Sequence, residues 1–504
     1  MSAEFTVSLW LEVPTDRSGI SGGLASQFDP ATRCGFNLDT VSSAGGYSGP
    51  SDELRISFGV DAGSEPRWLD LGRPSPTSNY VSNSLTVFEG RIHAATSDAP
   101  EPSDRAHVYR HLGEKEWENL GKVGVEGASG VGPMVVHRGG LYAATWNYDW
   151  TRVQDQDLRS CRVYHYESPG RWADCGQPGA SKRLFGIASW RGDLFVAGDD
   201  RTIHAYRGGQ RWEQIAAFDT FAHPLGIHGG DLILGMLQPA SVQRFDGRAW
   251  RQLGNPLDDP QRCDEVHAIA THRGELVVGT WPLGCVARWD EAGARWTEMG
   301  RLGDSTEVMD LTVYNGKLYA GTIPRAELFR YELDGSWTGL RRFYDPAGWQ
   351  PVPVADVDRT PDGDRRMRDW SRITSLTEHA GLLYASIGSC TSAAIDAPAD
   401  VRGSVYALGA GIVATTPHSL EPGWHHVAAT ARSSGVSIHV DGREAATSTG
   451  RLPAPVAREA PLRIGSGEAG AYRGRLDGFR LDEIPLDDRQ IAALAASRPV
   501  DSRT

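Results

Sequence analysis

The sequence predicts an all-β protein in which a seven-bladed β-propeller is inserted into a β-sandwich. One observation is a recurring motif of Trp, two residues and an apolar residue or Cys, usually followed by Gly, at intervals of 38 to 55 residues. One tryptophan per unit of this length is typical of a propeller built blade by blade. The other is that strand-like segments at the two ends of the chain each lack a partner that would close a core. The seven motif tryptophans are Trp68, Trp117, Trp172, Trp212, Trp250, Trp296 and Trp337.

Size and composition set the outer limits. A chain of 504 residues is too long for one ordinary core, so we expect at least two domains. Its formal net charge of −13 argues against nucleic acid or an anionic membrane as partner. No apolar run approaches the roughly 18–20 residues of a membrane span. The N-terminal segment carries no hydrophobic leader, so we expect a cytoplasmic protein or a leader upstream of this start.

The two terminal segments read as strands. Alternating apolar residues and Gly, Ser, Pro and Asp turns predict strands at 5–12, 23–28, 35–42 and 54–60. The complementary segment begins about 340 residues later. The two segments can therefore share a core only when the chain is folded. It contains expected strands at 411–416, 423–430, 436–445, 462–467 and 474–482, followed by a short helix capped by Asp487.

Together these pieces resemble the laminin G-like, concanavalin A-like jelly roll. The resemblance rests on the run Trp424-His425-His426-Val427, the Asp441-Gly442 hairpin and Asp477 in the penultimate strand. It implies a β-sandwich made from both ends of the chain and a framework role for His425 and His426. The strand that usually precedes the first one is absent, so the sandwich is either trimmed or begins upstream of residue 1.

Seven inner strands are expected between the halves. Each has an apolar residue, a turn with Gly and a Leu or Ile seven positions later, and the apolar residues stand at 85, 134, 187, 225, 269, 311 and 376. A second strand and a strand with Tyr or Phe follow, and in six of the seven units a Trp strand comes next. The units resemble kelch-type and related Trp-containing propellers, although the kelch Gly-Gly doublet is not in its place. The sialidase Asp-box and the WD40 signature are absent from the sequence.

The order of the strands predicts how the ring closes. Six Trp strands follow an inner strand, whereas Trp68 precedes the first one and the last unit has no Trp strand of its own. We therefore expect Trp68–Gly72 to complete the last blade, which removes the free sheet edges. The predicted domains are residues 1–64 and 410–504 for the jelly roll and 65–409 for the propeller.

The starts of the inner strands are expected to line the mouth of the central channel. Residues four and two places before each shared apolar residue fall on the same side of their strands. Their mixture of charges suits a polar or acidic ligand, with His or Glu able to carry a proton. The alternative is a solvated, salt-bridged channel without chemistry. The titratable and cationic candidates are His223, His267, Glu265, Glu307, Arg183 and Arg372.

Aromatic residues are the second group of candidates. Trp146, Tyr148 and Trp150 stand in a polar stretch after a second strand, and Trp281 has the equivalent place in the fifth unit. Exposed aromatic rings beside carboxylates are surfaces on which sugar rings stack. In the alternative interpretation these rings pack over the channel as lids.

A metal site is the third candidate. The insertion 341–372 contains Asp356, Asp358 and Asp362 in a run that resembles a calcium loop. The third Asp falls at position seven and Met367 stands at position twelve, where an EF-hand needs Glu. Calcium there is therefore one hypothesis and a solvated turn the other.

Four cysteines form two candidate disulfides. Cys161 and Cys175 flank a predicted hairpin, and Cys263 and Cys285 are expected on one face of the fifth unit. Disulfides in these pairs and buried free thiols are both compatible with the pattern. No Cys-x-x-Cys pair marks a thiolate zinc site.

Three functions remain open. The first is a lectin-like protein that binds a glycan or another polar small ligand. The second is a polysaccharide lyase or glycoside hydrolase with His223 or His267 as base and Glu265 or Glu307 as acid/base, while Arg183 and Arg372 neutralise a carboxylate. The third is a protein-interaction scaffold. No motif of nucleotide binding or serine hydrolysis is present, and we expect an extracellular or cell-surface location, with the cytoplasm as alternative.

Overall fold

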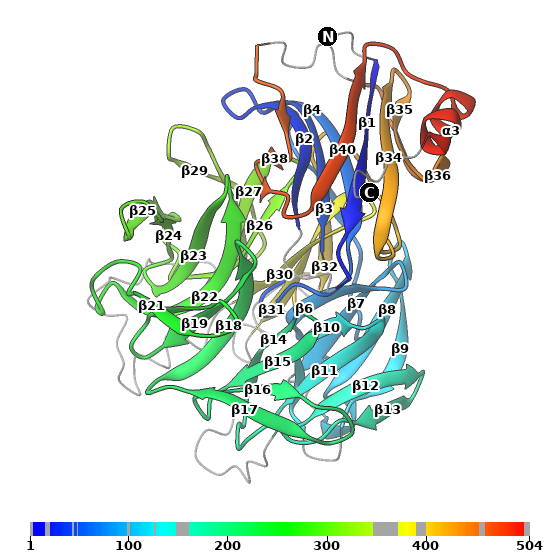
Figure 1. The fold of residues 1–504 in the computed structure, drawn as a ribbon. Coiled ribbons are helices and arrows are strands. Elements are labelled where there is room, and N and C mark those ends of the chain that lie inside the picture. The colour runs from blue at the N-terminus through cyan, green and yellow to red at the C-terminus, as the bar shows by residue number, and fades with distance from the viewer. Residues whose placement is uncertain are drawn as a thin grey trace.

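The computed structural model describes residues 4–15, 21–42, 45–47, 49–97, 101–124, 128–147, 161–345, 371–389, 400–452 and 459–497. Two bodies, a β-sandwich and a β-propeller, lie one against the other (Figure 1). Both ends of the chain belong to the sandwich, and the propeller is formed by the residues between them.

The sandwich has two sheets that interleave the two ends of the chain. The first sheet contains, in order, β36 (Arg443–Thr449), β35 (Gly435–Val440), β34 (Gly423–Arg432), β1 (Phe5–Val13) and β40 (Arg475–Asp482). The second contains β33 (Ile412–Thr415), β4 (Arg55–Ala62), β3 (Cys34–Val41) and β2 (Gly22–Asp29), with the short β37 (Arg463–Ile464), β38 (Ser466–Gly467) and β39 (Gly470–Ala471) beside β2.

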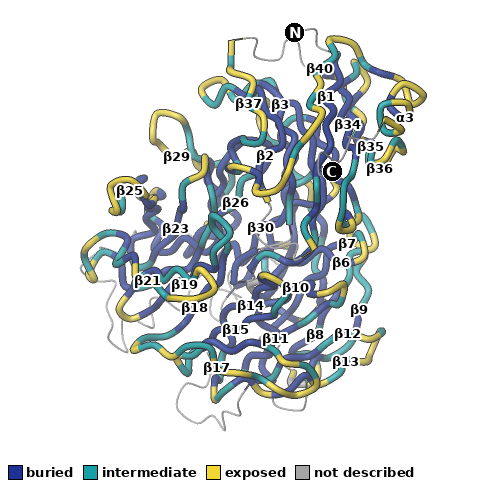
Figure 2. The backbone as a smooth tube through the Cα atoms, viewed as in Figure 1, coloured by how far each residue is buried: buried dark blue, intermediate teal, exposed yellow. Residues whose placement is uncertain are grey.

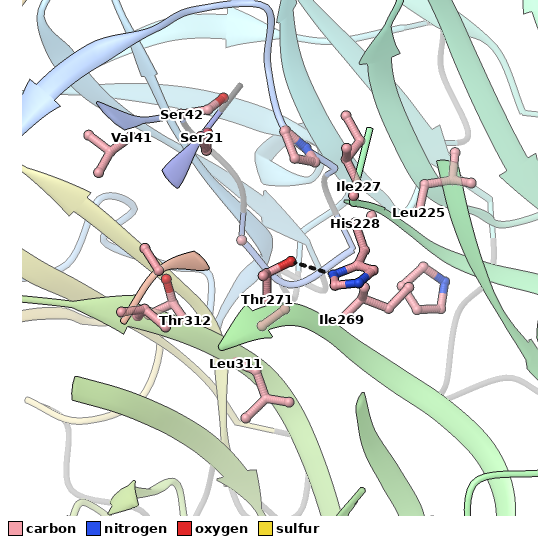
Figure 3. A pocket seen from close by; sticks show the side chains of 18 of the residues that line it. Ser21, Val41, Ser42, Leu225, Ile227, His228, Ile269, Thr271, Leu311 and Thr312 are labelled. Atoms are coloured by element: carbon pink, nitrogen blue, oxygen red, sulfur yellow. Dashed lines mark hydrogen bonds between the residues drawn. The ribbon is translucent and has the colours of Figure 1, made fainter. Parts of the chain in front are cut away.

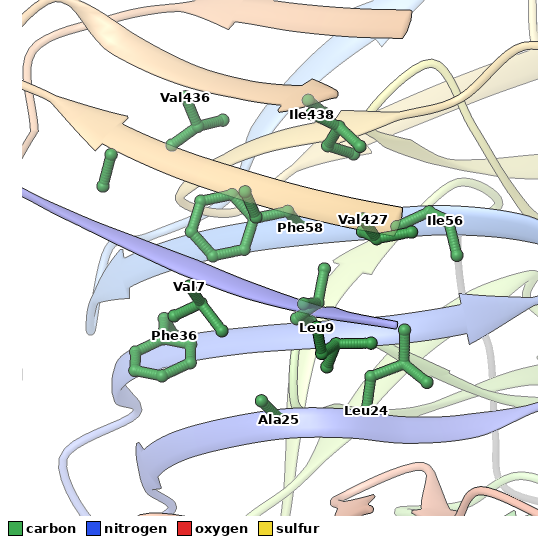
Figure 4. Close-up of a cluster of buried hydrophobic side chains, with 14 of the residues drawn as sticks. Val7, Leu9, Leu24, Ala25, Phe36, Ile56, Phe58, Val427, Val436 and Ile438 are labelled. Atoms are coloured by element: carbon green, nitrogen blue, oxygen red, sulfur yellow. The ribbon is translucent and has the colours of Figure 1, made fainter. Parts of the chain in front are cut away.

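Strand β1 shows why neither end folds as a separate sheet. It pairs with β34 on one side and β40 on the other, so an N-terminal strand is held between two C-terminal ones. Its alternate residues Phe5, Val7 and Leu9 are fully buried in the core between the sheets. Figure 4 shows Val7 and Leu9 among side chains from both ends of the chain. The period-2 pattern of the sequence therefore produces one shared core.

The helix after β40 is α3 (Asp488–Ala496). Asp487 is its N-cap, and the Asp487 carboxylate accepts from the Gln490 backbone while the Gln490 side chain accepts from the Asp487 backbone. This reciprocal capping box confirms the predicted cap. Ile491 is the fully buried residue of α3 and packs with Leu486 and Ala428 against the sandwich.

In the described residues the propeller consists of seven antiparallel four-stranded units. The inner strands are β6 (Tyr80–Phe88), β10 (Gly130–His137), β14 (Leu184–Trp190), β18 (Phe221–His228), β22 (Cys263–His272), β26 (Glu307–Tyr314) and β30 (Ser371–His379). The second strands are β7 (Arg91–Ser97), β11 (Gly140–Trp146), β15 (Asp193–Gly198), β19 (Asp231–Leu237), β23 (Glu275–Pro282), β27 (Lys317–Ile323) and β31 (Leu382–Ser389).

The outer half of each unit is less buried than the inner half (Figure 2). The third strands are β8 (His107–Gly113), β12 (Val163–Ser168), β16 (Thr202–Tyr206), β20 (Val242–Phe245), β24 (Cys285–Asp290), β28 (Glu327–Tyr331) and β32 (Val405–Gly409). The outermost strands are β9 (Glu116–Lys122), β13 (Arg171–Asp174), β17 (Trp212–Ala217), β21 (Trp250–Gly254), β25 (Arg295–Arg301), β29 (Trp337–Arg342) and β5 (Arg67–Asp70). A short 3₁₀ helix, η1 (Pro102–Asp104), precedes β8.

The ring of inner strands is closed. Each inner strand contacts the next one along the chain, and β30 contacts β6. In the seventh unit the outermost strand is β5, which pairs with β32 so that Trp68 stands opposite Leu408. The last blade thus takes one strand from ahead of the first blade, and the chain enters and leaves the propeller at the same place.

The Trp motif links neighbouring blades. In five units the indole Nε1 donates to the backbone oxygen of the apolar or Cys residue of the preceding motif copy, at 2.8 to 3.3 Å. In those five preceding copies the next residue is a glycine with positive φ, between +74° and +104°. The copies at Trp212 and Trp337 have no glycine there. Trp250 belongs to the copy that follows the Trp212 copy. Its indole nitrogen is buried and has no hydrogen-bond partner among the described residues.

The four cysteines of the two candidate disulfides are thiols. Cys161, Cys175, Cys263 and Cys285 are buried and free, which favours the alternative of buried thiols. Burial raises the pKa of the Cys161 thiol to about 12, so it stays protonated. Among the described residues no helix is long and apolar enough to cross a membrane.

The sandwich covers the propeller face on which inner and second strands turn into one another. Lys317 at the start of β27 forms a buried ion pair with Asp61 of β4, with Nζ and Oδ2 2.7 Å apart. The Asn315 amide donates to Ala410 O at 2.8 Å. The loop between β3 and β4 extends further, into the channel, where Gly49 N donates to Ile187 O of β14 at 2.6 Å. We call residues 45–47 and 49–52 of this loop the plug.

Candidate functional site

Four of the residues expected at the channel mouth lie together on three neighbouring inner strands. His223 comes from β18, Glu265 and His267 from β22, and Glu307 from the first position of β26. His267 Nε2 lies 2.6 Å from Glu265 Oε2, and His267 Nδ1 lies 2.8 Å from Glu307 Oε1. The ring centroids of His223 and His267 are 4.4 Å apart.

His267 is held as an imidazolium. Burial opposes its charge, but the attraction of Glu307 and the hydrogen bond with Glu265 outweigh that effect and raise the pKa of His267 to about 9. Burial likewise opposes the charge of Glu307, yet His267 and Arg372 hold the pKa of Glu307 below its ordinary value. At neutral pH the cluster therefore contains one protonated ring between two carboxylates.

His223 has the opposite protonation state. Burial lowers its pKa well below the ordinary value, and the neighbouring charge of His267 lowers it further. His223 Nδ1 lies 3.0 Å from Val266 O, a carbonyl oxygen that can accept a hydrogen bond but cannot donate one. The N–H of the neutral ring is therefore on Nδ1, and the lone pair is on Nε2. Two adjacent histidines thus carry different charges at the same pH.

The two candidate arginines differ in their surroundings. Arg372 of β30 is buried, lies 5.7 Å from the Tyr80 ring centroid and acts on Glu307 as a neighbouring positive charge. Arg183, just before β14, directs Nε to Asp199 Oδ2 at 3.3 Å and lies over the Phe185 ring. The positive charges of both arginines act on His223, although the guanidinium of Arg183 is paired with Asp199 in its own blade.

The aromatic candidates are only partly described. Trp146 is 4% exposed, and its Nε1 donates to Leu184 O at 2.8 Å, which favours the alternative that this ring packs over the channel. The indole is buried because the neighbouring blade satisfies its N–H and aromatic rings cover its faces. Trp281 is half-buried on β23 and stands opposite Glu265 in the strand ladder. Tyr148, Trp150 and the calcium candidates Asp356, Asp358 and Asp362 lie outside the described residues.

Beneath the mouth, a layer of rings closes the channel. Tyr47 of the plug is at its centre, with its ring centroid 4.3 Å from that of His223 and 6.0 Å from that of Phe185. The buried members of this layer are Tyr47, Tyr80, Trp146, Phe185, Met309 and Ile323. The sequence contained no signal for Tyr47 at the site, because it stands in an irregular Gly-rich stretch of the other domain.

Gln238 is a second residue that sequence reasoning missed. Its amide donates to Glu265 Oε1 at 2.9 Å, so both oxygens of that carboxylate have partners. Glu265 is thereby fixed toward His267. Among the described residues no cluster of three or more His, Cys, Asp or Glu side chains has the arrangement of a metal site.

A cavity lies on the other side of the ring layer, toward the sandwich. It has a volume of about 430 Å³ and is bounded by the plug and by β18, β22 and β26. Figure 3 shows apolar side chains of these strands, Leu225, Ile269 and Leu311 among them, together with His228, whose Nδ1 lies 2.9 Å from Thr271 Oγ1. The plug thus separates this cavity from the histidine pair.

Comparisons with known proteins identify the sandwich. The model of the concanavalin A-like lectin/glucanases superfamily matches residues 368–492. This range contains β33 to β40 of the sandwich and also β30 to β32, which in the structure belong to the propeller. The match covers about a quarter of the chain, so it describes a domain and not the whole protein. No curated protein is significantly similar to the sequence.

Two solved structures illustrate the fold comparison. A catalytically inactive variant of virginiamycin B lyase from Staphylococcus aureus, in complex with quinupristin, has 10% identity and a TM-score of 0.48, covering 68% of this chain and 99% of the other. YCF48 bound to a D1 peptide has 12% identity and a TM-score of 0.42, covering 69% of this chain and 96% of the other. At these values neither likeness says anything about function.

Proposed function

We propose that the protein acts on an acidic carbohydrate at the propeller mouth by general acid–base catalysis. One observation carries the proposal: two histidines 4.4 Å apart have pKa values displaced in opposite directions. Titratable pairs whose surroundings drive their pKa values apart are what proton-transfer chemistry requires. Calcium binding by Asp356, Asp358 and Asp362 and an extracellular or cell-surface location stay predictions.

The roles follow from the charges. His223 is neutral, with its lone pair on Nε2, and is the base, whereas His267 is protonated and is the acid. In a β-elimination His223 takes the proton from the carbon next to the uronate carboxylate. The bond from the neighbouring carbon to the leaving oxygen then breaks, a carbon–carbon double bond forms, and His267 gives its proton to that oxygen. No co-reactant is needed.

Carbohydrate is the proposed substrate class because of the sandwich. The superfamily whose model matches residues 368–492 is named after lectins and glucanases, which are carbohydrate-binding and carbohydrate-cleaving proteins. This description fits carbohydrate binding in general, and the protein-interaction scaffold stays a further prediction. The acidic sugar is proposed because the positive charges of Arg183 and Arg372 both act on His223, and a substrate carboxylate at the mouth would share Arg372 with Glu307.

The test is the release of unsaturated uronate from a panel of acidic polysaccharides, followed by ultraviolet absorbance. We expect turnover by the wild type and a loss of about 10²–10⁴-fold in kcat/KM for His223→Gln and for His267→Gln. His425→Gln is the control, because His425 lies on the sandwich and contacts Asp441. No turnover on any member of the panel, or full turnover by both variants, would reject the proposal.

A second candidate function is glycan binding without chemistry. It is favoured by the fact that both nitrogens of His267 already face carboxylates, as they would in a salt-bridged channel. Calorimetric titration with the same polysaccharides separates the two. Binding by the wild type that persists in His267→Gln, without product, would support the binding function.

A further inference from the structure

We infer that Tyr47, which the sandwich inserts into the propeller channel, is a positioning residue for the histidine pair and that the proposed site is therefore shared by both domains. This inference rests on the proposed function for its catalytic meaning. The effect of Tyr47, a residue of the sandwich, on the pKa of His267 in the propeller can be measured without any substrate.

The plug is fixed by the propeller itself. Gly46 N donates to Asp310 Oδ2 of β26 at 2.7 Å, and Asp52 N donates to Val136 O of β10 at 3.1 Å. With the bond from Gly49 to β14, these contacts attach the loop to three separate blades. Tyr47 stands between them and is 3% exposed. The backbone that carries Tyr47 is therefore fixed in the channel, and its ring packs against those of His223 and Phe185.

The hydroxyl of Tyr47 reaches the acid of the proposed pair. It lies 3.2 Å from His267 Nδ1, on the side of the ring that faces Glu307. A hydroxyl can accept from a protonated nitrogen and donate to a bare one, whereas a carboxylate can only accept. Tyr47 can therefore satisfy Nδ1 before and after His267 gives up its proton, whereas the charge of Glu307 favours only the protonated state.

The phenol itself stays protonated. Burial raises the pKa of Tyr47 well above its ordinary value, and the charge of Glu307 raises it further. The hydroxyl therefore keeps a proton to donate at every pH at which His267 titrates. The charged and titratable groups that face His267 are Glu265 of β22, Glu307 of β26, His223 of β18, Arg372 of β30 and Tyr47 of the plug.

Removing the Tyr47 hydroxyl destabilises the neutral state of His267 more than its protonated state. In Tyr47→Phe the imidazolium keeps both carboxylates, but a neutral His267 with its proton on Nε2 would point the Nδ1 lone pair at the carboxylate of Glu307, which cannot donate. We therefore expect the pKa of His267 to rise. The acid-dissociation constant of His267 should fall about threefold or more.

The experiment is an NMR titration of protein with ¹³Cε1-labelled histidine, in which the His267 signal is assigned by its loss in His267→Gln. Tyr319→Phe is the matched control, since Tyr319 is a fully buried propeller tyrosine whose hydroxyl has no hydrogen-bond partner among the described residues. We expect an upward displacement in Tyr47→Phe and none in Tyr319→Phe. Thermal unfolding checks that both variants fold as the wild type does.

The outcomes separate this inference from the proposed function. An unchanged titration of His267 in a folded Tyr47→Phe variant would overturn the inference, whatever the activity. A displaced titration in a protein that turns over no polysaccharide would reject the proposed function and keep the inference. If the wild type is active, the alkaline limb of kcat/KM, which reports the acid His267, moves upward in Tyr47→Phe.

Discussion

At the scale of single residues, the motif tryptophan has two separate functions. Its ring fills the space between blades, and its Nε1 bonds to the preceding blade wherever a glycine with positive φ follows the accepting residue. A residue with a side chain rarely adopts that backbone conformation, so the motif needs glycine. Ala216 stands in that place in the Trp212 copy, and the indole nitrogen of Trp250 is left without a partner among the described residues.

This difference predicts unequal costs for one substitution. Trp296→Phe removes the 2.9 Å bond from Nε1 to Leu253 O, whereas Trp250→Phe removes a buried nitrogen that has no bond to lose. Both indoles are half-buried, so the loss of ring volume is comparable. We expect Trp296→Phe to lower the free energy of unfolding by about 1 kcal/mol more than Trp250→Phe. Urea denaturation measures it, and equal losses would contradict the role given to the glycine.

The charge of His267 predicts how stability depends on pH. Its pKa is about 9 in the folded chain, above the value of about 6.5 in an unfolded one. The stabilisation from its proton is therefore complete below pH 6.5 and is lost as the pH rises through 9. We expect the stability difference between the wild type and His267→Gln to shrink from pH 7 to pH 10. A constant difference would show that His267 is neutral in the folded protein.

At the scale of elements, the strands were predictable and the chemistry of the mouth was not. Alternation along β1 and the repeated Trp strands are local patterns, so their positions follow from the sequence. Tyr47 lies in a loop without periodicity, and its partners His223 and His267 are more than 170 residues away. The burial of Trp146 and the opposite charges of the histidines also depend on neighbours that only the folded chain brings together.

The one helix of the sandwich in the described residues predicts a local effect. Asp487→Ala removes the side-chain acceptor for the backbone N–H of Gln490 and breaks the capping box. We expect the substitution to destabilise α3 by about 1 kcal/mol. Hydrogen exchange of the amides in α3 should increase, while exchange in β1 and β34 should not. Slower or unchanged exchange in α3 would mean that packing of Ile491 alone holds the helix.

At the scale of the whole molecule, the two domains are interlocked. The first strand of the sandwich lies between two strands that follow the propeller, and β5 completes the last blade. The plug enters the channel from the sandwich, and the Lys317–Asp61 ion pair is buried between the two. The proposed domain limits at residues 64/65 and 409/410 stay a prediction, yet the pairing of β1 with β34 and β40 joins the two ends of the propeller segment.

This interlocking predicts a single cooperative unfolding transition for a chain long enough to show two. Calorimetry of the wild type should give one heat-absorption peak. Lys317→Met leaves the carboxylate of Asp61 buried without its cation, which typically costs about 3–5 kcal/mol. Because the pair joins the domains, we expect the substitution to move the single peak to lower temperature without dividing it, and Asp61→Asn in the same chain to restore part of the loss. Two peaks in the wild type, or a second peak in Lys317→Met, would mean that the sandwich and the propeller unfold independently and that the ring is held closed by β5 alone.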